Sequence, residues 1–265
     1  MFNYPHIDPI IIAIGPFQLR WYSLAYIFGI LSPLYFFQNT FFKKLKMSVD
    51  DYLNYVTYLI ISVIIGGRIG YIVFYDLIYY LENPTSIIKI WQGGMSYHGG
   101  AIGVIVGTYL YAKLHNKPVL QMLDILSLGS TIGIGLGRIA NFINGELYGK
   151  VSTSIFAMVF PSGGPLPRHP SQLYEAFFEG GVLFVSLWFI RKVYNPRPGY
   201  IGAFYLLFYS TFRFFIEFFR EPDAHIGFVF SIFSRGHIYC LIQFIVGLII
   251  LGSLHKLYQS SNKAN

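Results

Sequence analysis

Apolar residues dominate the chain in long runs that are separated by short polar segments. A helix needs roughly 20 apolar residues to cross a hydrocarbon core of about 30 Å. Runs of this kind lie near 19–42, 54–75, 97–112, 119–142, 172–190, 199–219 and 237–255. Polar residues interrupt the third and the fifth, so their ends are the least sharply defined. The pattern predicts an all-α, polytopic membrane protein with about seven transmembrane helices and with re-entrant or extracytoplasmic segments between some of them.

The composition agrees with lipid as the solvent. Of the 265 residues, 54% are hydrophobic and only 12% are charged, and the mean hydropathy is +0.52. One soluble core rarely hides that much apolar surface. The sequence shows no repeat, low-complexity tract or linker, so we expect a single integral membrane domain over residues 1–265. Residues 1–18 hold no Lys or Arg, unlike a secretory signal peptide, and we expect the first helix to stay attached.

The formal net charge of +7 does not predict nucleic-acid binding, because the cations form no basic stripe. They divide instead between alternate sides of the expected membrane. One side carries Lys43, Lys44, Lys46, Lys113, Lys117, Arg191, Lys192, Arg197, Lys256 and Lys263. The other side carries fewer: Arg20, Lys89, Lys150, Arg168, Arg220 and Arg235. The positive-inside rule then places the amino terminus outside and the carboxyl terminus in the cytoplasm.

Three further cations, Arg68, Arg138 and Arg213, fall inside or at the end of expected spans. Each would cost about 3 kcal/mol or more there without a partner or water. They are the residues whose presence demands an explanation.

Glycines and turn residues shape the remaining segments. The outer segments near 76–96 and 143–170 contain Gly and Pro turn signals and are expected to form extracytoplasmic caps. Two stripes at four-residue spacing predict close helix packing: Gly99, Gly103 and Gly107, and Gly129, Gly133 and Gly137. Cys240, the single cysteine, excludes an internal disulfide and is read as an apolar filler. No metal is expected, since the acidic residues form no cluster suited to Mg²⁺.

The stretch GLGRIANFINGELYG, residues 135–149, places polar side chains at the end of an apolar run. Helical geometry puts Arg138 and Asn141 on one face. Asn144 and Glu146 follow where the helix is expected to stop, at Gly145. This pattern fits a polar pocket at membrane depth. A buried Arg–Glu pair that only fixes helix packing fits it equally well.

A second polar stripe runs along the segment YSTFRFFIEFFREPD. Tyr209, Arg213 and Glu217 follow one another at four-residue spacing, and Arg220 comes three residues later. The Arg213–Glu217 spacing allows an intrahelical ion pair. Together with Arg138, Arg213 could instead grip an anion, because guanidinium groups offer forked donors suited to phosphate.

Three more motifs carry candidate residues. His98 opens a helix between glycines, where it is either a proton acceptor or a hydrogen-bonded structural residue. Ser171 follows Pro170 and is expected to cap a helix start, which leaves His169, Gln172 and Tyr174 as candidate lining. Tyr22 follows Arg20 and Trp21 at the outer end of the first span, where it serves either as an interfacial anchor or as a substrate contact.

Five uncommon strings occur in an order that resembles the prolipoprotein diacylglyceryl transferase family, over nearly the whole chain. They are GGRIGYIVFYD (66–76), GGMSYHGGAIGV (93–104), GRIANFINGELYG (137–149), PRHPSQLYEA (167–176) and FRFFIEFFREPD (212–223). The resemblance implies a seven-helix enzyme of the bacterial inner membrane that needs no cofactor. It would move the sn-1,2-diacylglyceryl group of phosphatidylglycerol to the lipobox cysteine of a preprolipoprotein, forming a thioether and releasing glycerol-1-phosphate.

The resemblance also implies roles for individual residues. The essential arginines of the family fall on Arg138 and Arg213, and other sensitive positions match as they stand: Tyr22, His98, Asn141, Glu146, Gly149, Tyr209 and Glu217. On this reading Arg138 and Arg213, aided by Asn141 and Tyr209, hold the lipid phosphate. His98 is the best titratable base for the acceptor thiol, and Glu146 and Glu217 orient the arginines. Membrane lipids are the remaining expected partners.

Two departures from the family pattern stand out. Many members open the last helix with Met-Gly-Gln-x-Leu-Ser, whereas this chain has Arg235-Gly236-His237-Ile238-Tyr239-Cys240. The change of Gln to His at 237 puts any role of that position in question. The segment between Tyr148 and Arg168 is shorter than in some members, so we expect the outer cap to differ.

Two other classes of function remain open from the residues alone. Intramembrane arginines and glycine-broken helices also occur in lipid or small-molecule transporters, although the paired halves common in transporters are absent here. A purely structural membrane scaffold would leave the arginines unexplained.

Overall fold

The computed structural model describes residues 2–15, 17–221, 228–230 and 233–263. The chain divides into two compact units, one formed by Met1–Pro33 with Leu126–Asn265 and the other by Leu34–Ile125. Most of both units is helical. The main helices are α1 (Trp21–Phe37), α3 (Val49–Tyr75), α5 (Tyr97–Leu114), α6 (Val119–Ile143), α7 (Ser171–Glu175), α8 (Leu183–Tyr194), α9 (Tyr200–Ile216) and α10 (Arg235–Lys263).

Long apolar helices confirm the all-α membrane class. Among the described residues, four stretches are long and apolar enough to cross a bilayer: Val49–Tyr75, Val119–Ile143, Ser171–Tyr194 and Arg235–Asn262. Two shorter apolar helices, Trp21–Phe37 and Tyr200–Ile216, accompany them. Each expected span overlaps one of the helices named above. The role of each helix as a membrane span stays a prediction.

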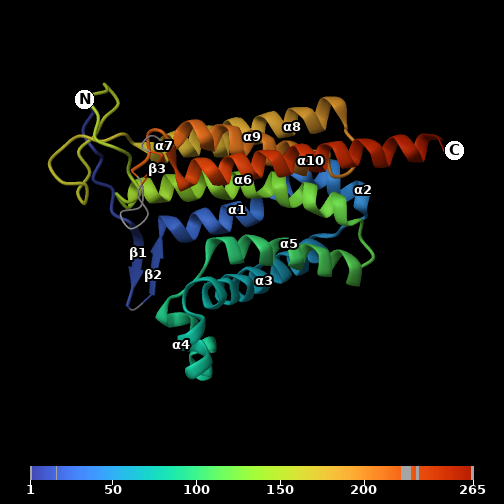
Figure 1. Ribbon diagram of the computed structural model, residues 1–265, viewed down its shortest axis with the longest axis horizontal. Coiled ribbons are helices and arrows are strands. Elements are labelled where there is room, and N and C mark those ends of the chain that lie inside the picture. The colour runs from blue at the N-terminus through green and yellow to red at the C-terminus, as the bar shows by residue number, and fades with distance from the viewer. Residues whose placement is uncertain (1, 16, 222–227, 231–232, 264–265) are drawn as a thin grey trace. The chain divides into compact units, whose positions relative to one another are not determined.

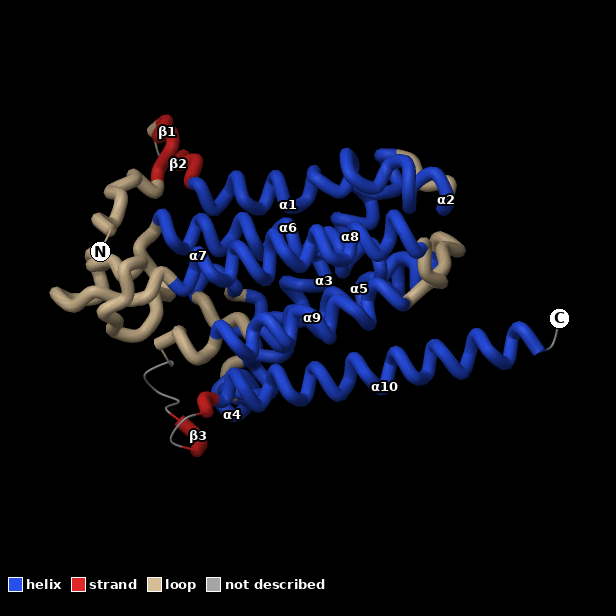
Figure 2. Tube along the Cα trace, turned by 90° about the horizontal axis from the view of Figure 1, so that it is seen from above, coloured by secondary structure: helices blue, strands red, loops and turns tan. Residues whose placement is uncertain are grey.

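In the first unit, the axes of α6, α8, α9 and α10 are roughly aligned with one another, whichever way the chain runs along them (Figures 1 and 2). A π-helical segment, Ala176–Val182, joins α7 to α8. A Cβ added to Gly180 in that segment would lie 2.4 Å from the Cα of Gly135, so the backbones of the π-helix and α6 touch. Helix α9 packs on α10. This arrangement places the polar residues of α6, α7 and α9 in one unit.

The second unit is built on the packing of α3 against α5. A Cβ on Gly99 would lie 2.3 Å from the carbonyl oxygen of Gly66, and one on Gly103 would lie 2.2 Å from that of Ser62. Only glycine allows so close an approach, which confirms the packing interpretation of the first glycine stripe.

The second glycine stripe behaves differently. A Cβ on Gly29 of α1 would lie 3.0 Å from the Cα of Gly133, so α1 does approach α6 there. A Cβ on Gly133 or Gly137 itself, however, would meet no described heavy atom within 4 Å. The closest approach to α6 is instead at Gly135, which is two residues from Gly133 and Gly137 and therefore lies on roughly the opposite face of the helix.

Arg68 is explained within the second unit. Its guanidinium donates to five carbonyl oxygens of the segment near 76–96 at 2.5–3.3 Å, namely those of Ser86, Ile87, Lys89, Gly93 and Gly94. The guanidinium carbon also lies 4.9 Å from the centre of the Tyr80 ring in α4 (Leu77–Glu82). Arg68 therefore holds the segment near 76–96 in its fold.

Small strands interrupt the helical plan, and the sequence did not predict them. β1 (Ile10–Ile14) and β2 (Phe17–Arg20) form an antiparallel hairpin that leads directly into α1. β3 (Phe228–Phe230) pairs with β4 (Phe233–Ser234) just before α10.

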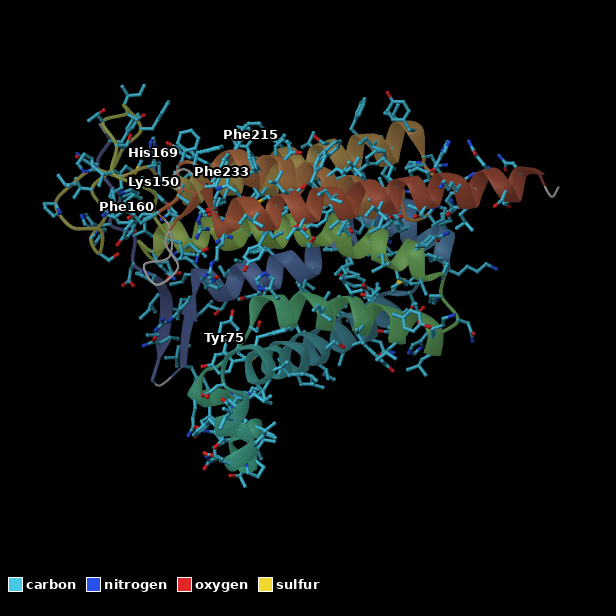
Figure 3. All side chains as sticks on the ribbon, in the orientation of Figure 1. Tyr75, Lys150, Phe160, His169, Phe215 and Phe233 are labelled. Carbon is cyan, nitrogen blue, oxygen red and sulfur yellow. The ribbon has the colours of Figure 1, made fainter. Side chains whose placement is uncertain are left out.

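The cap near 143–170 is anchored by a small aromatic core. Tyr4, Phe142 and Phe160 are buried together, and the Tyr4 hydroxyl reaches the carbonyl oxygens of Phe142 and Ile143 at 2.8 and 2.9 Å. Helix α6 ends there, and Gly145 follows with a φ of +68°. Lys150, Phe160 and His169 gather at this end of the unit (Figure 3).

Candidate active site

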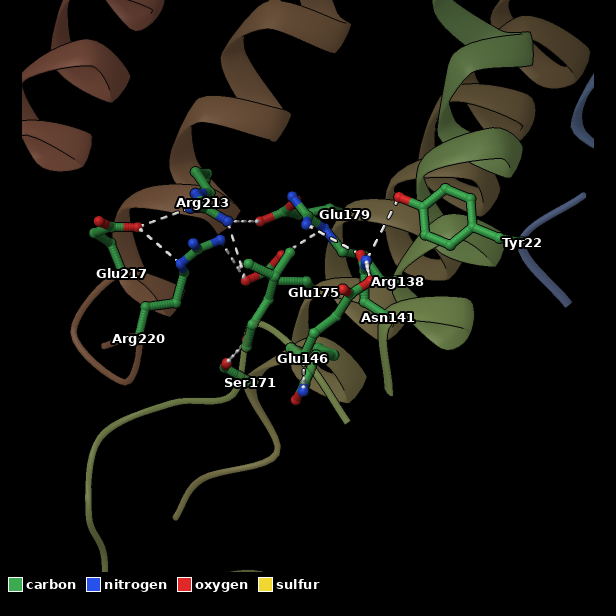
Figure 4. A network of polar contacts seen from close by, with 12 residues as sticks. Tyr22, Arg138, Asn141, Glu146, Ser171, Glu175, Glu179, Arg213, Glu217 and Arg220 are labelled. Atoms are coloured by element: carbon green, nitrogen blue, oxygen red, sulfur yellow. Dashed lines mark hydrogen bonds and ion pairs between the residues drawn. The ribbon is translucent and has the colours of Figure 1, made fainter. Parts of the chain in front are cut away.

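A buried carboxylate, Glu175, lies at the centre of the polar cluster in the first unit. Its Oε1 is 3.1 Å from Nη1 of Arg213 and 3.1 Å from Nη1 of Arg220. Its Oε2 is 2.5 Å from Nε of Arg138. This last contact is a charge pair without an aligned N–H, since Oε2 accepts no hydrogen bond from the described residues. Glu175 thus lies between Arg138 on one side and Arg213 and Arg220 on the other (Figure 4).

Helix α9 supplies the second part of the cluster. Nη2 of Arg213 donates to Oε2 of Glu217 at 2.9 Å, which confirms the intrahelical ion pair expected from their spacing. Nη1 of Arg213 also lies 3.5 Å from Oε1 of Glu179. Nε of Arg220 is 3.8 Å from Glu217. Three arginines and three glutamates therefore neutralise one another in a largely buried space.

The end of α6 supplies the third part. Nη1 of Arg138 donates to Oδ1 of Asn141 at 3.4 Å, so the two side chains share a face as the helical spacing predicted. Nδ2 of Asn141 donates to Oε1 of Glu146 at 2.7 Å and lies 3.5 Å from the Tyr22 hydroxyl. Tyr22, the second residue of α1, thereby reaches the cluster. The described hydrogen bonds and ion pairs of Arg138 thus involve Nη1 and Nε.

Glu146 does not pair with an arginine. Its carboxylate accepts from Asn141 and, at 3.2 Å, from Nδ2 of Asn144. The buried partner of Arg138 is Glu175. The two residues meet because the helix after Pro170 packs against α6. The buried Arg–Glu pair, one of the two interpretations that the sequence left open, thus forms with Glu175 and not with Glu146.

Gly149 holds the cap against the end of α9. Its N–H donates to the carbonyl oxygen of His169 at 2.8 Å, and it forms an isolated β-bridge with Arg220. A Cβ at this position would lie 2.3 Å from the carbonyl oxygen of Phe219. The absence of a side chain at 149 thus lets the cap backbone approach Phe219 and Arg220, in the segment just after α9.

Ser171 does not cap the helix it begins. Its hydroxyl donates to the carbonyl oxygen of Leu147 at 3.1 Å, and no side-chain cap bond is present at this helix start. Nε2 of Gln172 donates to the carbonyl oxygen of Glu146 at 2.5 Å. The capping expectation is wrong because Ser171 instead ties α7 to the loop that follows α6.

Two carboxylates of the site, Glu175 and Glu179, are not among the candidate residues that the sequence motifs supplied. A usable signal existed: Glu179 lies inside an apolar span, where the cost of an ionisable side chain is the same as for the arginines. Both are buried, and their four-residue spacing puts them on one face.

Tyr209 and His98 are the remaining predicted site residues. Tyr209 lies one turn before Arg213 on α9, and its ring stacks on Tyr205. His98 belongs to the second unit, where it is the second residue of α5 and is exposed. The predicted helix opening at His98 is confirmed, with Ser96 as its N-cap. The role of His98 as a base stays a prediction.

The start of α10 explains the unusual His237. The Ser234 N–H donates to Nδ1 of His237 at 3.1 Å, and the Ser234 hydroxyl donates to Oε1 of Glu217 at 2.7 Å. His237 stands three residues after Ser234, where Glu or Gln closes a capping box by accepting from the N-cap N–H. Imidazole performs the same task here. The departure from Gln therefore keeps the helix start, which in turn holds Glu217.

An apolar cavity of about 600 Å³ lies on another face of α9. Aromatic and polar side chains from the cap, α7, the π-helix and α9 line it: Ser154, Phe156, His169, Tyr174, Phe178, Phe212, Phe215, Ile216 and Phe219. Nδ1 of His169 is 3.2 Å from the Tyr174 hydroxyl, and burial lowers the pKa of His169 below its usual value. The predicted lining residues His169 and Tyr174 thus meet in a space suited to an apolar ligand.

Comparisons with known proteins agree over nearly the whole chain. A family model described as prolipoprotein diacylglyceryl transferase matches residues 9–252. A relative from Pseudoalteromonas translucida is 48% identical over 255 residues, which cover 94% of this chain and 93% of the relative. One from Paramagnetospirillum magneticum is 45% identical over 256 residues, or 94% of each chain. One from Rickettsia felis is 43% identical over 265 residues, or 98% of this chain and 100% of the relative.

All three relatives bear the name phosphatidylglycerol–prolipoprotein diacylglyceryl transferase. Their similarity extends through both polar stripes and both caps. The chain therefore belongs to the prolipoprotein diacylglyceryl transferase family.

Proposed function

We propose that this chain moves the sn-1,2-diacylglyceryl group of phosphatidylglycerol onto the lipobox cysteine of preprolipoproteins. The thiolate sulfur attacks the diacylglyceryl carbon that carries the phosphate ester. A thioether C–S bond forms, the C–O bond to phosphate breaks, and glycerol-1-phosphate leaves with the bonding electrons. The thiol proton passes to a base. This is the first step of bacterial lipoprotein maturation.

The observation that carries the proposal is the meeting of Arg138 and Arg213 at Glu175. Two guanidinium groups from different helices converge where a phosphodiester could replace or join the shared carboxylate. As negative charge develops on the departing phosphate, their fixed donors would stabilise it, and one such donor can contribute about 3 kcal/mol. Asn141, Tyr22 and Glu146 support Arg138 from one side, while Glu217 and Tyr209 flank Arg213 on α9.

We also propose where the lipid chains and the membrane lie. The apolar cavity beside α9 suits an acyl chain, because aromatic side chains dominate its lining and the described lining residues include no Asp, Glu, Lys or Arg. The loop charges support a bacterial inner-membrane location, with the amino terminus outside and the carboxyl terminus in the cytoplasm. A reporter fused to the carboxyl terminus and found outside the cell would contradict this orientation.

A transporter or flippase is the rival function. The relatives are named as transferases, and these names do not favour a transporter. A lipobox peptide incubated with purified protein and phosphatidylglycerol separates the two, since only group transfer shifts the peptide to a lipidated band on a gel.

In that assay we expect Arg138→Lys to lose most of its transfer activity. In the unchanged protein the forked guanidinium of Arg138 can bind phosphate while its Nε stays paired with Glu175. Lysine keeps the charge but has a single amino group in place of this fork. Arg197→Lys is the matched control, because Arg197 pairs with the carboxyl-terminal part of α10, at the Tyr258 carbonyl oxygen and Asn262. Full activity of Arg138→Lys would refute the phosphate role.

We propose His98 as the base that takes the thiol proton. A free thiol has a pKa of about 8.5, so only a few per cent is thiolate at neutral pH. His98→Gln should therefore transfer slowly at pH 7, and raising the pH to 9 should recover part of the rate. A defect of equal size at both pH values would make His98 structural.

A further inference from the structure

The β1–β2 hairpin has two chemically different faces. The register pairs Ile12 with Leu19 and Ile14 with Phe17, and it pairs Ala13 with Gln18. Side chains alternate along a strand, and opposite residues share a face. One face therefore consists of Ile12, Ile14, Phe17 and Leu19. The other face holds Ala13, Gln18 and Arg20, with Ile10 opposite Arg20 beyond a bulge, and Nη2 of Arg20 donates to Oε1 of Gln18 at 2.8 Å.

The apolar face is open in the structure. Ile12 is 52% exposed, Ile14 is 73% exposed and Phe17 is 79% exposed. A two-stranded hairpin is at best marginally stable alone in water, and such a face usually marks a binding surface. The hairpin therefore needs a partner for this side.

The hairpin continues directly into α1, an apolar helix of a membrane protein. Arg20 and Trp21 mark the junction, where Trp typically lies at the level of the lipid headgroups. Nε1 of Trp21 donates to the carbonyl oxygen of Asp8 at 3.1 Å, which fixes the base of the hairpin. The strands run across the direction of α1 (Figure 1). If α1 crosses the bilayer, the hairpin lies along its surface.

We propose that the β1–β2 hairpin is an interfacial membrane anchor whose Ile12, Ile14, Phe17 and Leu19 face enters the boundary between headgroups and acyl chains. The Gln18 and Arg20 face points to water. The unpaired outer edges of a two-stranded ribbon would be too costly in the hydrocarbon core, so the hairpin stays at the interface. It is a β-ribbon counterpart of the amphipathic helices that lie in this layer.

The anchor would set the depth of the residues that follow it. Tyr22 comes two residues after the hairpin and lies 3.5 Å from Nδ2 of Asn141. Fixing the hairpin at the membrane surface therefore helps hold the Tyr22 hydroxyl at the depth of the polar cluster. This role does not depend on the identity of the transferred group.

Depth-resolved spin labelling tests the proposal in lipid nanodiscs that contain phosphatidylglycerol. Single nitroxides are placed at Ile14→Cys and Ile12→Cys on the apolar face. The neighbours Ala13→Cys and Gln18→Cys are matched controls on the other face. Cys240 is buried, and labelling of the unchanged protein measures its background. Peptide lipidation by each labelled variant confirms that it is folded.

We expect power saturation to show more collision with oxygen than with a water-soluble nickel chelate at positions 12 and 14. The order should reverse at positions 13 and 18. Equal accessibility on the two faces would overturn the proposal. So would an immobilised label at position 14 in both detergent and nanodiscs, because it would place this face against protein, either the same chain or a second copy. If labelling at Ile14 disturbs folding, Phe17→Cys supplies the same comparison.

Discussion

At the scale of single residues, the charge balance around Glu175 is the main finding. One carboxylate contacts Arg138, Arg213 and Arg220, while Glu179 and Glu217 contact Arg213. Arginine keeps its charge even when partly buried, so the glutamates provide the compensation. Removing one member of a buried ion pair typically costs about 3–5 kcal/mol, because the partner is left uncompensated.

We predict that Glu175→Gln lowers both stability and peptide lipidation. The substitution keeps the size of the side chain but leaves three arginines facing two glutamates, so they repel one another and move apart. Thermal unfolding in detergent should shift downwards by several degrees, and the gel-shift rate should fall at least about tenfold, the factor that corresponds to 1.4 kcal/mol.

Glu82→Gln is the control for this substitution, because Glu82 is exposed at the end of α4. It should change neither measurement. Unaltered lipidation by folded Glu175→Gln would mean that the arginines reach their working positions without the shared carboxylate.

Residue spacing predicted some of these contacts and could not predict others. The pairs Arg138–Asn141 and Arg213–Glu217 lie within one helix, where periodicity alone determines the face. The contacts of Glu175 with Arg138 and Arg213 join segments that are 37 and 38 residues apart in sequence. Such contacts depend on how helices pack, which one sequence does not reveal.

At the scale of elements, the start of α10 shows how a changed residue can preserve a structure. His237 accepts from the Ser234 N–H, while the Ser234 hydroxyl donates to Glu217. The lone pair on Nδ1 accepts the hydrogen bond that the side-chain oxygen of Gln would otherwise accept. The helix start and the orientation of Glu217 are thereby linked.

We predict that His237→Gln retains both thermal stability and lipidation, whereas His237→Leu loses part of each. Leucine fills the aromatic pocket formed by Phe214, Phe218 and Phe233 but cannot accept the hydrogen bond. Loss of a helix cap typically costs about 1 kcal/mol. Equal unfolding temperatures for His237→Leu and the unchanged protein would show that the capping box contributes nothing.

Glycine patterns at the element scale were informative only in part. Spacing identified Gly99 and Gly103 correctly, because each meets the backbone of α3. On α6 it identified Gly133, which the backbone of α1 approaches at Gly29, but it missed Gly135, which meets the backbone of Gly180 on the opposite face. A helix with glycines on several faces offers more than one packing surface, and the neighbouring helices determine which of these surfaces is used.

At the scale of the whole molecule, hydropathy predicted the all-α membrane class and the approximate extent of its helices, because lipid demands long apolar segments. It did not predict the β1–β2 hairpin. Residues 10–19 are apolar like the span that follows, so hydropathy does not separate them. The strand signals are the β-branched isoleucines at 10–12 and 14 and the Gly15-Pro16 turn pair, and they cover too few residues to be decisive.

Arg68, unlike the arginines around Glu175, has no carboxylate among its described contacts, and its surroundings determine how the fold of residues 84–94 responds to salt. The cation is surrounded by carbonyl dipoles rather than by a carboxylate. Mobile ions weaken attraction between exposed charges, but they cannot enter a buried cradle of backbone oxygens. The fold of residues 84–94 should therefore be indifferent to ionic strength, and transfer of the protein from dilute buffer to concentrated salt should leave this segment intact.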